Sequence, residues 1–204
     1  MNNERREEII LATLQLASQY GLRGISMSMI AEKVGIKKPS LYNHFKSKAE
    51  IVNEMYEFLR GKAMKKATKE IPANYFDNKT GCEILQAMVE NYIALSTEGN
   101  MHMFYKVIYC ERAISREASK IMVNETEKMI NATMQVFSVL QAKNLLSFSN
   151  LEFSAITFAL TIHGLMDYEA DKSLSETGSV ARNIKPINDF IVNFCEQHSI
   201  RSKT

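Results

Sequence analysis

The chain has 204 residues, of which 46% are hydrophobic and 24% charged, with a formal net charge of +2. This balance is typical of a globular protein with a buried core and excludes a disordered chain. No uncharged apolar run approaches the roughly 20 residues of a membrane-spanning helix, and no apolar signal segment follows the polar start MNNERREE, so we expect a cytoplasmic protein without a membrane partner.

Helices joined by short loops are expected throughout, because the chain has only eight Gly and three Pro and lacks the alternating pattern of strands. A first helix is predicted over residues 4–20, where Gly21 allows the left-handed stop. A second, short helix is predicted over residues 27–34. Ser26 can cap its start and Gly35 can end it.

A third helix is predicted over residues 39–45, since Pro39 is well suited to a first helical position. The sequence Ser47-Lys48-Ala49-Glu50 follows as a capping box, in which the Ser and Glu side chains satisfy free backbone amides. This box predicts the start of a fourth helix, over residues 48–70.

The best candidate boundary between two domains lies at Pro72 and the polar residues 74–79. It predicts an N-terminal domain over residues 1–48, a connecting helix over 48–70 and a larger helical domain over 71–204. Capping boxes at Thr80-x-x-Glu83 and Ser149-x-x-Glu152 predict two of the later helix starts. About nine helices are expected in all, the later ones over residues 81–97, 101–112, 116–143, 151–168 and 179–198.

Residues 26–50 combine a short helix, a glycine-containing turn and a second short helix, the arrangement of a helix-turn-helix that lays its second helix in the major groove of DNA. Residues 1–70 contain 13 Lys and Arg against 8 Asp and Glu, whereas residues 71–204 contain 12 against 15. Five lysines and no acid lie between Lys33 and Lys48, a pattern that favours a surface facing phosphates over a merely solvated basic face.

At these positions the sequence resembles the N-terminal signature of the tetracycline-repressor (TetR) family, over about residues 5–55. Two departures are Lys37, where the family usually has Ser or Thr, and Met29, where it often has an acid. The residues that carry the resemblance are Ile30, Ala31, Val34, Gly35, Ile36, Leu41, Tyr42, His44, Phe45 and Lys48.

The resemblance implies a fold and a set of DNA contacts. The expected fold is all-helical (all-α), with a three-helix DNA-binding domain and a C-terminal helical bundle for ligand binding and dimerisation. Phosphate contacts are implied for Tyr42, His44 and Lys48, and base-edge contacts for Lys38, Ser40 and Asn43. The full set of expected DNA-binding residues is Ser26, Ser28, Lys37, Lys38, Pro39, Ser40, Tyr42, Asn43, His44 and Lys48.

A regulator of this kind also needs a signal, and the second domain has an aromatic and Met-rich set of residues that could line a pocket. We expect an apolar or aromatic small-molecule effector with one or two polar handles, although each of these residues could equally be core. The candidate ligand residues are Met88, Tyr92, His102, Phe104, Tyr105, Ile108, Asn131, Met134, Phe137, Phe158 and His163.

The last two predicted helices are apolar on more than one side, which predicts that they pack both on their own domain and on a second copy. The resemblance implies a dimeric four-helix bundle at this place. The predicted dimer residues are Leu151, Ala155, Phe158, Ile162, Leu165, Ile184, Ile187, Ile191 and Phe194.

The predicted function is a dimeric, sequence-specific transcriptional regulator that binds a palindromic operator in double-stranded DNA. Repression relieved by a small molecule is the expected mode; an activator, or a regulator acting by protein contact on the same fold, are the alternatives. Catalysis is not expected, because GxSxG, HExxH, P-loop and GxGxxG motifs are missing. The scattered His and the three Cys without a CxxC pair predict no metal site, no cofactor and no disulfide framework.

Overall fold

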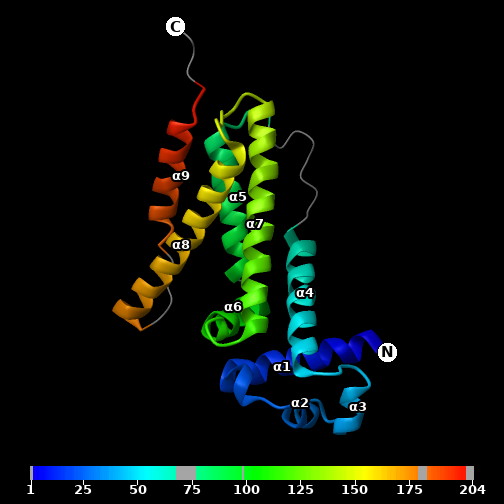
Figure 1. Cartoon of the computed structure of the whole chain (residues 1–204). Helices are drawn as coiled ribbons and strands as arrows, with labels where there is room; N and C mark the ends of the chain where they lie inside the picture. The colour runs from blue at the N-terminus through cyan, green and yellow to red at the C-terminus, as the bar shows by residue number, and fades with distance from the viewer. Residues whose placement is uncertain (1, 68–76, 98, 179–182, 201–204) are drawn as a thin grey trace. The chain divides into compact units, whose positions relative to one another are not determined.

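The computed structural model describes residues 2–67, 77–97, 99–178 and 183–200, and every regular element within these ranges is a helix (Figure 1). The predicted all-helical class is therefore confirmed. The predicted boundary at Pro72 and the ends of two predicted helices, at 68–70 and 179–182, lie outside the described residues. The helices are α1 (Asn2–Gly24), α2 (Met27–Val34), α3 (Lys38–Tyr42), α4 (Lys48–Ala67), α5 (Gly81–Thr97), α6 (Gly99–Glu111), α7 (Arg116–Ala142), α8 (Leu151–Thr177) and α9 (Lys185–Gln197).

Two compact units make up the chain. Unit 1 comprises Met1–Glu70 and Tyr92–Asn124, and unit 2 comprises Ile71–Asn91 and Glu125–Thr204. This division differs from the predicted domains, which placed all residues after 70 together. The physical reason is that the apolar face of α6 completes the same buried core as α1 and α4.

In unit 1, α1 packs against α2, α4 and α6, and α4 also packs against α6. Ile9, Ile10 and Leu14 of α1 are at most 1% exposed, so this helix forms the centre of the core. The rings of Tyr56 and Phe104 stack with centroids 6.0 Å apart, which joins α4 to α6. Burial of this extent makes the helix-turn-helix and α6 parts of one packed body.

The C-terminal end of α1 turns at Gly21, whose φ of 69° and ψ of 162° are accessible almost solely to glycine. Just beyond it, the backbone N–H of Leu22 donates to Oε1 of Glu111 at the end of α6, at 2.9 Å. The second carboxylate oxygen of Glu111 is buried and has no hydrogen-bond partner among the described residues. The buried carboxylate therefore holds the end of α1 through one oxygen.

Two further side chains hold the same segment. The ammonium of Lys48, at the start of α4, donates to the carbonyls of Leu22 and Ile25, the latter at 2.9 Å. The guanidinium of Arg23 donates to the carbonyl of Ile114, in the loop after α6, at 2.8 Å. A cation at helix-terminal carbonyls is favourable because these groups lack intrahelical donors.

Unit 2 has an aromatic core. The rings of Phe137 and Phe148 stack with centroids 4.3 Å apart, and Phe158 meets Phe194 edge-on at 4.9 Å. The loop before α8 is fastened to the end of α9 because the N–H of Ser147 donates to the carbonyl of His198 at 2.8 Å. These contacts join α7, α8 and α9 around one cluster of rings.

The helix starts agree with the predicted capping boxes in part. At α5, Thr80 and Glu83 exchange hydrogen bonds as predicted. The hydrogen bond from the backbone N–H of Thr80 lowers the pKa of Glu83. The cap is therefore complete at neutral pH and is lost as the pH falls through that lowered pKa. At α8 the prediction was wrong, since Asn150 is the capping residue and accepts from the N–H of Phe153 at 2.9 Å. The α8 helix also continues to Thr177, well beyond the predicted end at 168.

None of the helices in the described ranges is long and apolar enough to cross a bilayer. Within those same ranges, no group of three or more His, Cys, Asp or Glu is placed to hold a metal ion.

We predict that Gly21→Ala lowers the free energy of unfolding by about 1–3 kcal/mol, because a Cβ there meets Oε1 of Glu111 at 2.9 Å in a backbone conformation unfavourable to alanine. Urea denaturation measures the change. The matched control is Gly61→Ala in α4, whose added Cβ has no neighbour within 4 Å and which should be neutral or stabilising by up to about 1 kcal/mol. Equal effects of the two substitutions would contradict the strained role of Gly21.

Candidate nucleic-acid interface

The first helix of the motif, α2, is capped at both ends as its sequence predicts. The Oγ of Ser26 accepts the N–H of Met29 at 3.3 Å. At the other end, Gly35 adopts φ 74° and ψ 32°, and the N–H of Ile36 donates to the carbonyl of Ala31 at 2.9 Å. This left-handed stop fixes the direction in which the chain leaves α2.

The second helix, α3, is shorter than predicted and spans only five residues, Lys38–Tyr42. The chain turns directly afterwards, where His44 and Phe45 each donate a backbone N–H to the carbonyl of Leu41 at 3.0 Å. Leu41 and Phe45 are fully buried. A helix of this length has little stability of its own, so its orientation depends on these two anchors and on the residues around them.

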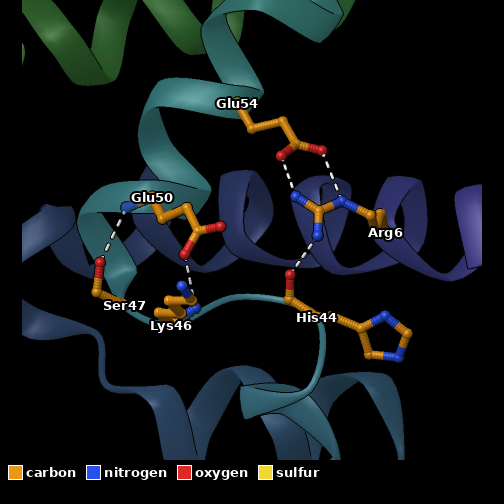
Figure 2. A network of polar contacts seen from close by, with 6 residues as sticks. All are labelled: Arg6, His44, Lys46, Ser47, Glu50 and Glu54. Atoms are coloured by element: carbon orange, nitrogen blue, oxygen red, sulfur yellow. Dashed lines mark hydrogen bonds and ion pairs between the residues drawn. The ribbon is translucent and has the colours of Figure 1, made fainter.

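Arg6 of α1 joins the segment after α3 to α4 (Figure 2). Its guanidinium forms a two-pronged ion pair with Glu54, in which Nε donates to Oε1 at 2.9 Å and Nη2 donates to Oε2. The third nitrogen, Nη1, donates to the backbone carbonyl of His44. The hydrogen bond to Glu54 raises the pKa of Arg6 above its ordinary value, so the guanidinium is charged at every physiological pH.

The same guanidinium lies over the ring of Phe45, 4.1 Å from its centroid. Beside it, Oε2 of Glu50 accepts the backbone N–H of Lys46 at 2.6 Å, and the N–H of Glu50 donates to Oγ of Ser47 at 3.1 Å (Figure 2). The predicted capping box is thus present in modified form, with its carboxylate on Lys46 instead of Ser47. All of these contacts hold the backbone of residues 44–47, which leaves the opposite side of α3 free.

The side chains on that opposite side are polar or basic and accessible. Lys37, Lys38, Pro39, Tyr42 and Asn43 are exposed, with Tyr42 at 45%. An acidic side chain is missing from the sequence between Lys33 and Lys48, so no carboxylate of this segment opposes a phosphate. The face of α3 therefore presents hydrogen-bond donors and positive charge.

Ser40 and His44 are half-buried at the edge of this face. Nδ1 of His44 is enclosed and has no hydrogen-bond partner among the described residues. Leaving a buried polar nitrogen unpaired costs about 1–3 kcal/mol, and such groups need a structural or functional reason. The backbone carbonyl of His44 accepts a hydrogen bond from Arg6, whereas its ring points away from Arg6 in Figure 2. The ring therefore takes no part in the contact to Arg6.

The remaining predicted DNA-binding residues have different surroundings. Ser28 is exposed on α2, and the Oγ of Ser26 serves as the helix cap. Lys48 uses two of its three N–H donors on the carbonyls of Leu22 and Ile25, inside unit 1. The contacts of Lys48 are therefore structural and leave it one donor.

The predicted ligand residues are divided between the two compact units. Five lie in unit 1 (Tyr92, His102, Phe104, Tyr105 and Ile108) and six in unit 2 (Met88, Asn131, Met134, Phe137, Phe158 and His163). Phe104 and Ile108 are fully buried in the core with α1, and Phe137 and Phe158 belong to the aromatic core of unit 2. For these four residues, packing within a unit explains the apolar character that suggested a pocket.

A hollow of about 380 Å³ lies elsewhere in unit 1, on the surface of α1 and the end of α2. None of the predicted ligand residues lines it. Its walls are Glu4, Glu7, Glu8, Leu11, Ala12, Gln15, Lys33 and Val34.

Most of the predicted dimer residues are buried in the interior of unit 2. They are therefore not exposed on the surface of the single chain. Those that are buried within the chain are Ala155, Phe158, Ile162, Ile187, Ile191 and Phe194, while Leu151 and Leu165 are half-buried and Ile184 is 42% exposed. A different face of α8 is open, where Phe153, Leu160 and Tyr168 are 66%, 49% and 61% exposed. Both faces of α8 carry apolar residues, so the sequence pattern did not distinguish the face that packs inward from the exposed one.

The ion pair of Arg6 with Glu54 and the hydrogen bond of Leu22 to Glu111 were not recognised from the sequence. Arg6 and Glu54 are 48 residues apart, and Glu111 is 89 residues from Leu22. A local pattern does not reveal such pairs.

The geometry defines a helix-turn-helix of the DNA-binding class, and comparison with other proteins agrees. Residues 9–55 match the family model described as bacterial regulatory proteins, tetR family. The chain is 35% identical over 57 residues to the class C tetracycline repressor of Escherichia coli, covering 28% of this chain and 26% of that protein. It is 26% identical over 172 residues to the regulator AcrR of Shigella flexneri, covering 80% of this chain and 77% of that protein.

Solved structures share the fold over nearly the whole chain. A TetR-family transcriptional regulator from Mesorhizobium loti superimposes with a TM-score of 0.73 at 18% identity, covering 98% of this chain and 99% of that one. A transcriptional regulator from Saccharomonospora viridis in complex with choline gives a TM-score of 0.68 at 16% identity, covering 98% and 100%. Residues 9–55 thus resemble the tetR family of bacterial regulatory proteins, and the chain as a whole shares the fold of these solved structures.

We predict that Arg6→Lys lowers the free energy of unfolding by about 1–2 kcal/mol, because lysine cannot make the two-pronged contact to Glu54 and also reach the carbonyl of His44. Arg5→Lys is the matched control. Arg5 forms an exposed pair with Glu8 three residues away, and its replacement should change stability by less than about 0.5 kcal/mol. Similar urea midpoints for the two variants would contradict the role given to Arg6.

Proposed function

We propose that the protein is a cytoplasmic, homodimeric repressor of transcription that binds a palindromic operator and leaves it when a small molecule binds. One observation carries the DNA-binding part of this proposal. A rigidly held α3 presents Lys37, Lys38, Tyr42 and Asn43 to solvent, with no acid in the segment. This arrangement favours major-groove binding, because the second helix of the motif must be fixed from behind and accessible in front.

The exposed side chains divide by chemistry into two roles. Lys38 can donate to guanine and Asn43 can pair with adenine through two hydrogen bonds, while Ser40 can serve either base type. Lys37, Tyr42 and His44 are suited to phosphate oxygens, which fix the register without reading sequence. Lys48 supports the interface indirectly, since its contacts hold the end of α1.

Dimerisation would use the open face of α8. Phe153, Thr157, Leu160, Gly164 and Tyr168 follow one another at intervals of three or four residues, so they form one stripe along the helix. All five are exposed, and a Cβ added at Gly164 would have no neighbour within 4 Å. Large apolar residues around a small one allow two helices to approach closely, which suits the same helix of a second copy.

The effector would act through α6. Because residues 92–124 belong to the same compact unit as the helix-turn-helix, a displacement of α6 acts directly on α1 through Glu111. A ligand shifts DNA affinity only by binding the two states differently, typically by 1–3 kcal/mol. Of the candidate ligand residues, Tyr92 and His102 lie in the same unit as α1 and are accessible to an organic molecule with a polar handle, and the choline complex of the S. viridis relative supports small-molecule control.

Selection of bound sequences from random duplex DNA tests the proposal. We expect a palindrome whose half-site centres are about 10 base pairs, or a multiple, apart, with affinity that falls steeply as salt rises. Asn43→Ala should relax the preference at one position of each half-site and cost about 1–3 kcal/mol there, whereas Tyr42→Phe should weaken all sequences alike. Asn100→Ala, at an exposed position on α6, is the matched control and should change neither property. Failure to enrich any sequence at low salt would overturn the proposal.

Sedimentation equilibrium tests the dimer surface. We predict that Leu160→Glu gives a folded monomer of 23.2 kDa, because a carboxylate at the centre of the α8 stripe would be buried against its own copy. Val123→Glu is the matched control, since Val123 is a 54% exposed apolar residue on α7, outside the stripe. It should remain a dimer, and a dimeric Leu160→Glu would show that another face is used.

A further inference from the structure

Two of the three cysteines meet in unit 2. Cys82 is the second residue of α5, and Cys195 lies in the last turns of α9. The thiol of Cys195 lies near enough to that of Cys82 to be affected by it, although the two residues are 113 positions apart in the chain. The sequence predicted no disulfide framework, and the spacing of the cysteines along the chain gives no sign of the pair.

The fold holds these two helix ends together independently of the thiols. Gly81, next to Cys82, lies so close to Leu146 that an added Cβ would be 2.7 Å from its Cγ. The following residue, Ser147, is bound to His198 by two contacts, N–H to carbonyl at 2.8 Å and ring nitrogen Nδ1 to carbonyl oxygen at 3.1 Å. Cys195 is one helical turn before His198. The loop after α7 thus connects the start of α5 to the end of α9, which lie toward the same end of the helices of unit 2 in Figure 1.

The two thiols differ in accessibility. Cys195 is 7% exposed, and its burial, followed by the nearby Cys82, raises the pKa of the Cys195 thiol to about 12. Cys195 is therefore a neutral thiol at physiological pH. Cys82 is half-buried and can be reached from solvent, so a reagent meets Cys82 first.

We propose that Cys82 and Cys195 are a redox pair, which a hydroperoxide converts into an intramolecular disulfide. In the first step the Cys82 sulfur attacks one peroxide oxygen, the O–O bond breaks, and Cys82 becomes a sulfenic acid while water leaves. In the second step the Cys195 sulfur attacks the Cys82 sulfur, the S–O bond breaks, and the released hydroxide takes the Cys195 proton and leaves as water. Both thiols are oxidised, the peroxide is reduced, and the balance is two thiols and one hydrogen peroxide giving one disulfide and two waters.

The disulfide would join α5 covalently to α9 and close a loop that includes α6, α7 and α8. Reactive cysteine pairs of this kind, with an accessible first thiol beside a second that resolves it, are typical of reversible oxidation sites. Cys110 is exposed on α6 in unit 1, so a reagent can reach it too, and it is replaced in the test for this reason.

The test uses the full-length protein carrying Cys110→Ser, treated with hydrogen peroxide, alkylated and digested with trypsin without reduction. Trypsin places Cys82 in residues 80–106 and Cys195 in residues 183–201, so the disulfide appears as these two peptides joined, two hydrogens lighter than their sum. We expect this product in monomer-sized chains, a faster reaction as the pH rises, and complete reversal by dithiothreitol.

The variant Cys82→Ser should abolish the joined product while keeping the native circular dichroism, since position 82 is half-buried. Cys195→Ala tests the partner and should leave Cys82 as an alkylation-resistant sulfenic or sulfinic acid. Oxidation of Cys82 beyond the sulfenic acid in the Cys195-containing protein, without the joined product, would overturn the proposal. Disulfides formed solely between two chains would overturn it equally.

Discussion

The contacts of the Arg6 guanidinium are the interaction on which the DNA-binding surface depends. One planar cation pairs with Glu54 of α4, donates to the backbone carbonyl of His44 and covers the ring of Phe45. The recognition helix α3 has only five residues, and a helix of this length has little stability of its own. Because all these contacts lie behind the recognition helix, α3 can present its polar side chains to DNA without using any of them for support.

The second constraint lies at the other end of α1. Glu111 and Lys48 each satisfy a backbone group in the segment that leads from α1 to α2, and Arg23 of this segment donates to the carbonyl of Ile114. Two of these contacts reach residues of α6 and the loop after it. Since α6 shares its core with α1 and α4, the helix-turn-helix and residues 92–124 belong to the same compact unit. In the proposed mechanism, an effector needs only to displace α6 in order to alter the orientation of the motif.

Local signals in the sequence were sufficient to identify the motif and the presence of most helices, although not the ends of α3 and α8. Capping residues and left-handed glycines, such as Ser26 and Gly35, act over a few residues, and they gave the bounds of α2 as the structure has them. The partners of Arg6 and Glu111 could not be predicted, because each pair joins residues that only the tertiary fold brings together. The two faces of α8 posed a different problem. Both are apolar, so periodicity identified a helix with two partners but could not decide whether Phe158 or Leu160 faces its own unit.

The central claim is that α3 and its flanks meet DNA while α8 does not. Hydrogen–deuterium exchange of the protein, measured free and bound to a selected palindromic duplex, tests this claim most directly. We expect slower amide exchange across residues 26–45 in the complex, and no DNA-dependent change along the exposed face of α8 around Leu160. Slower exchange confined to α8, with residues 26–45 unchanged, would contradict the claim.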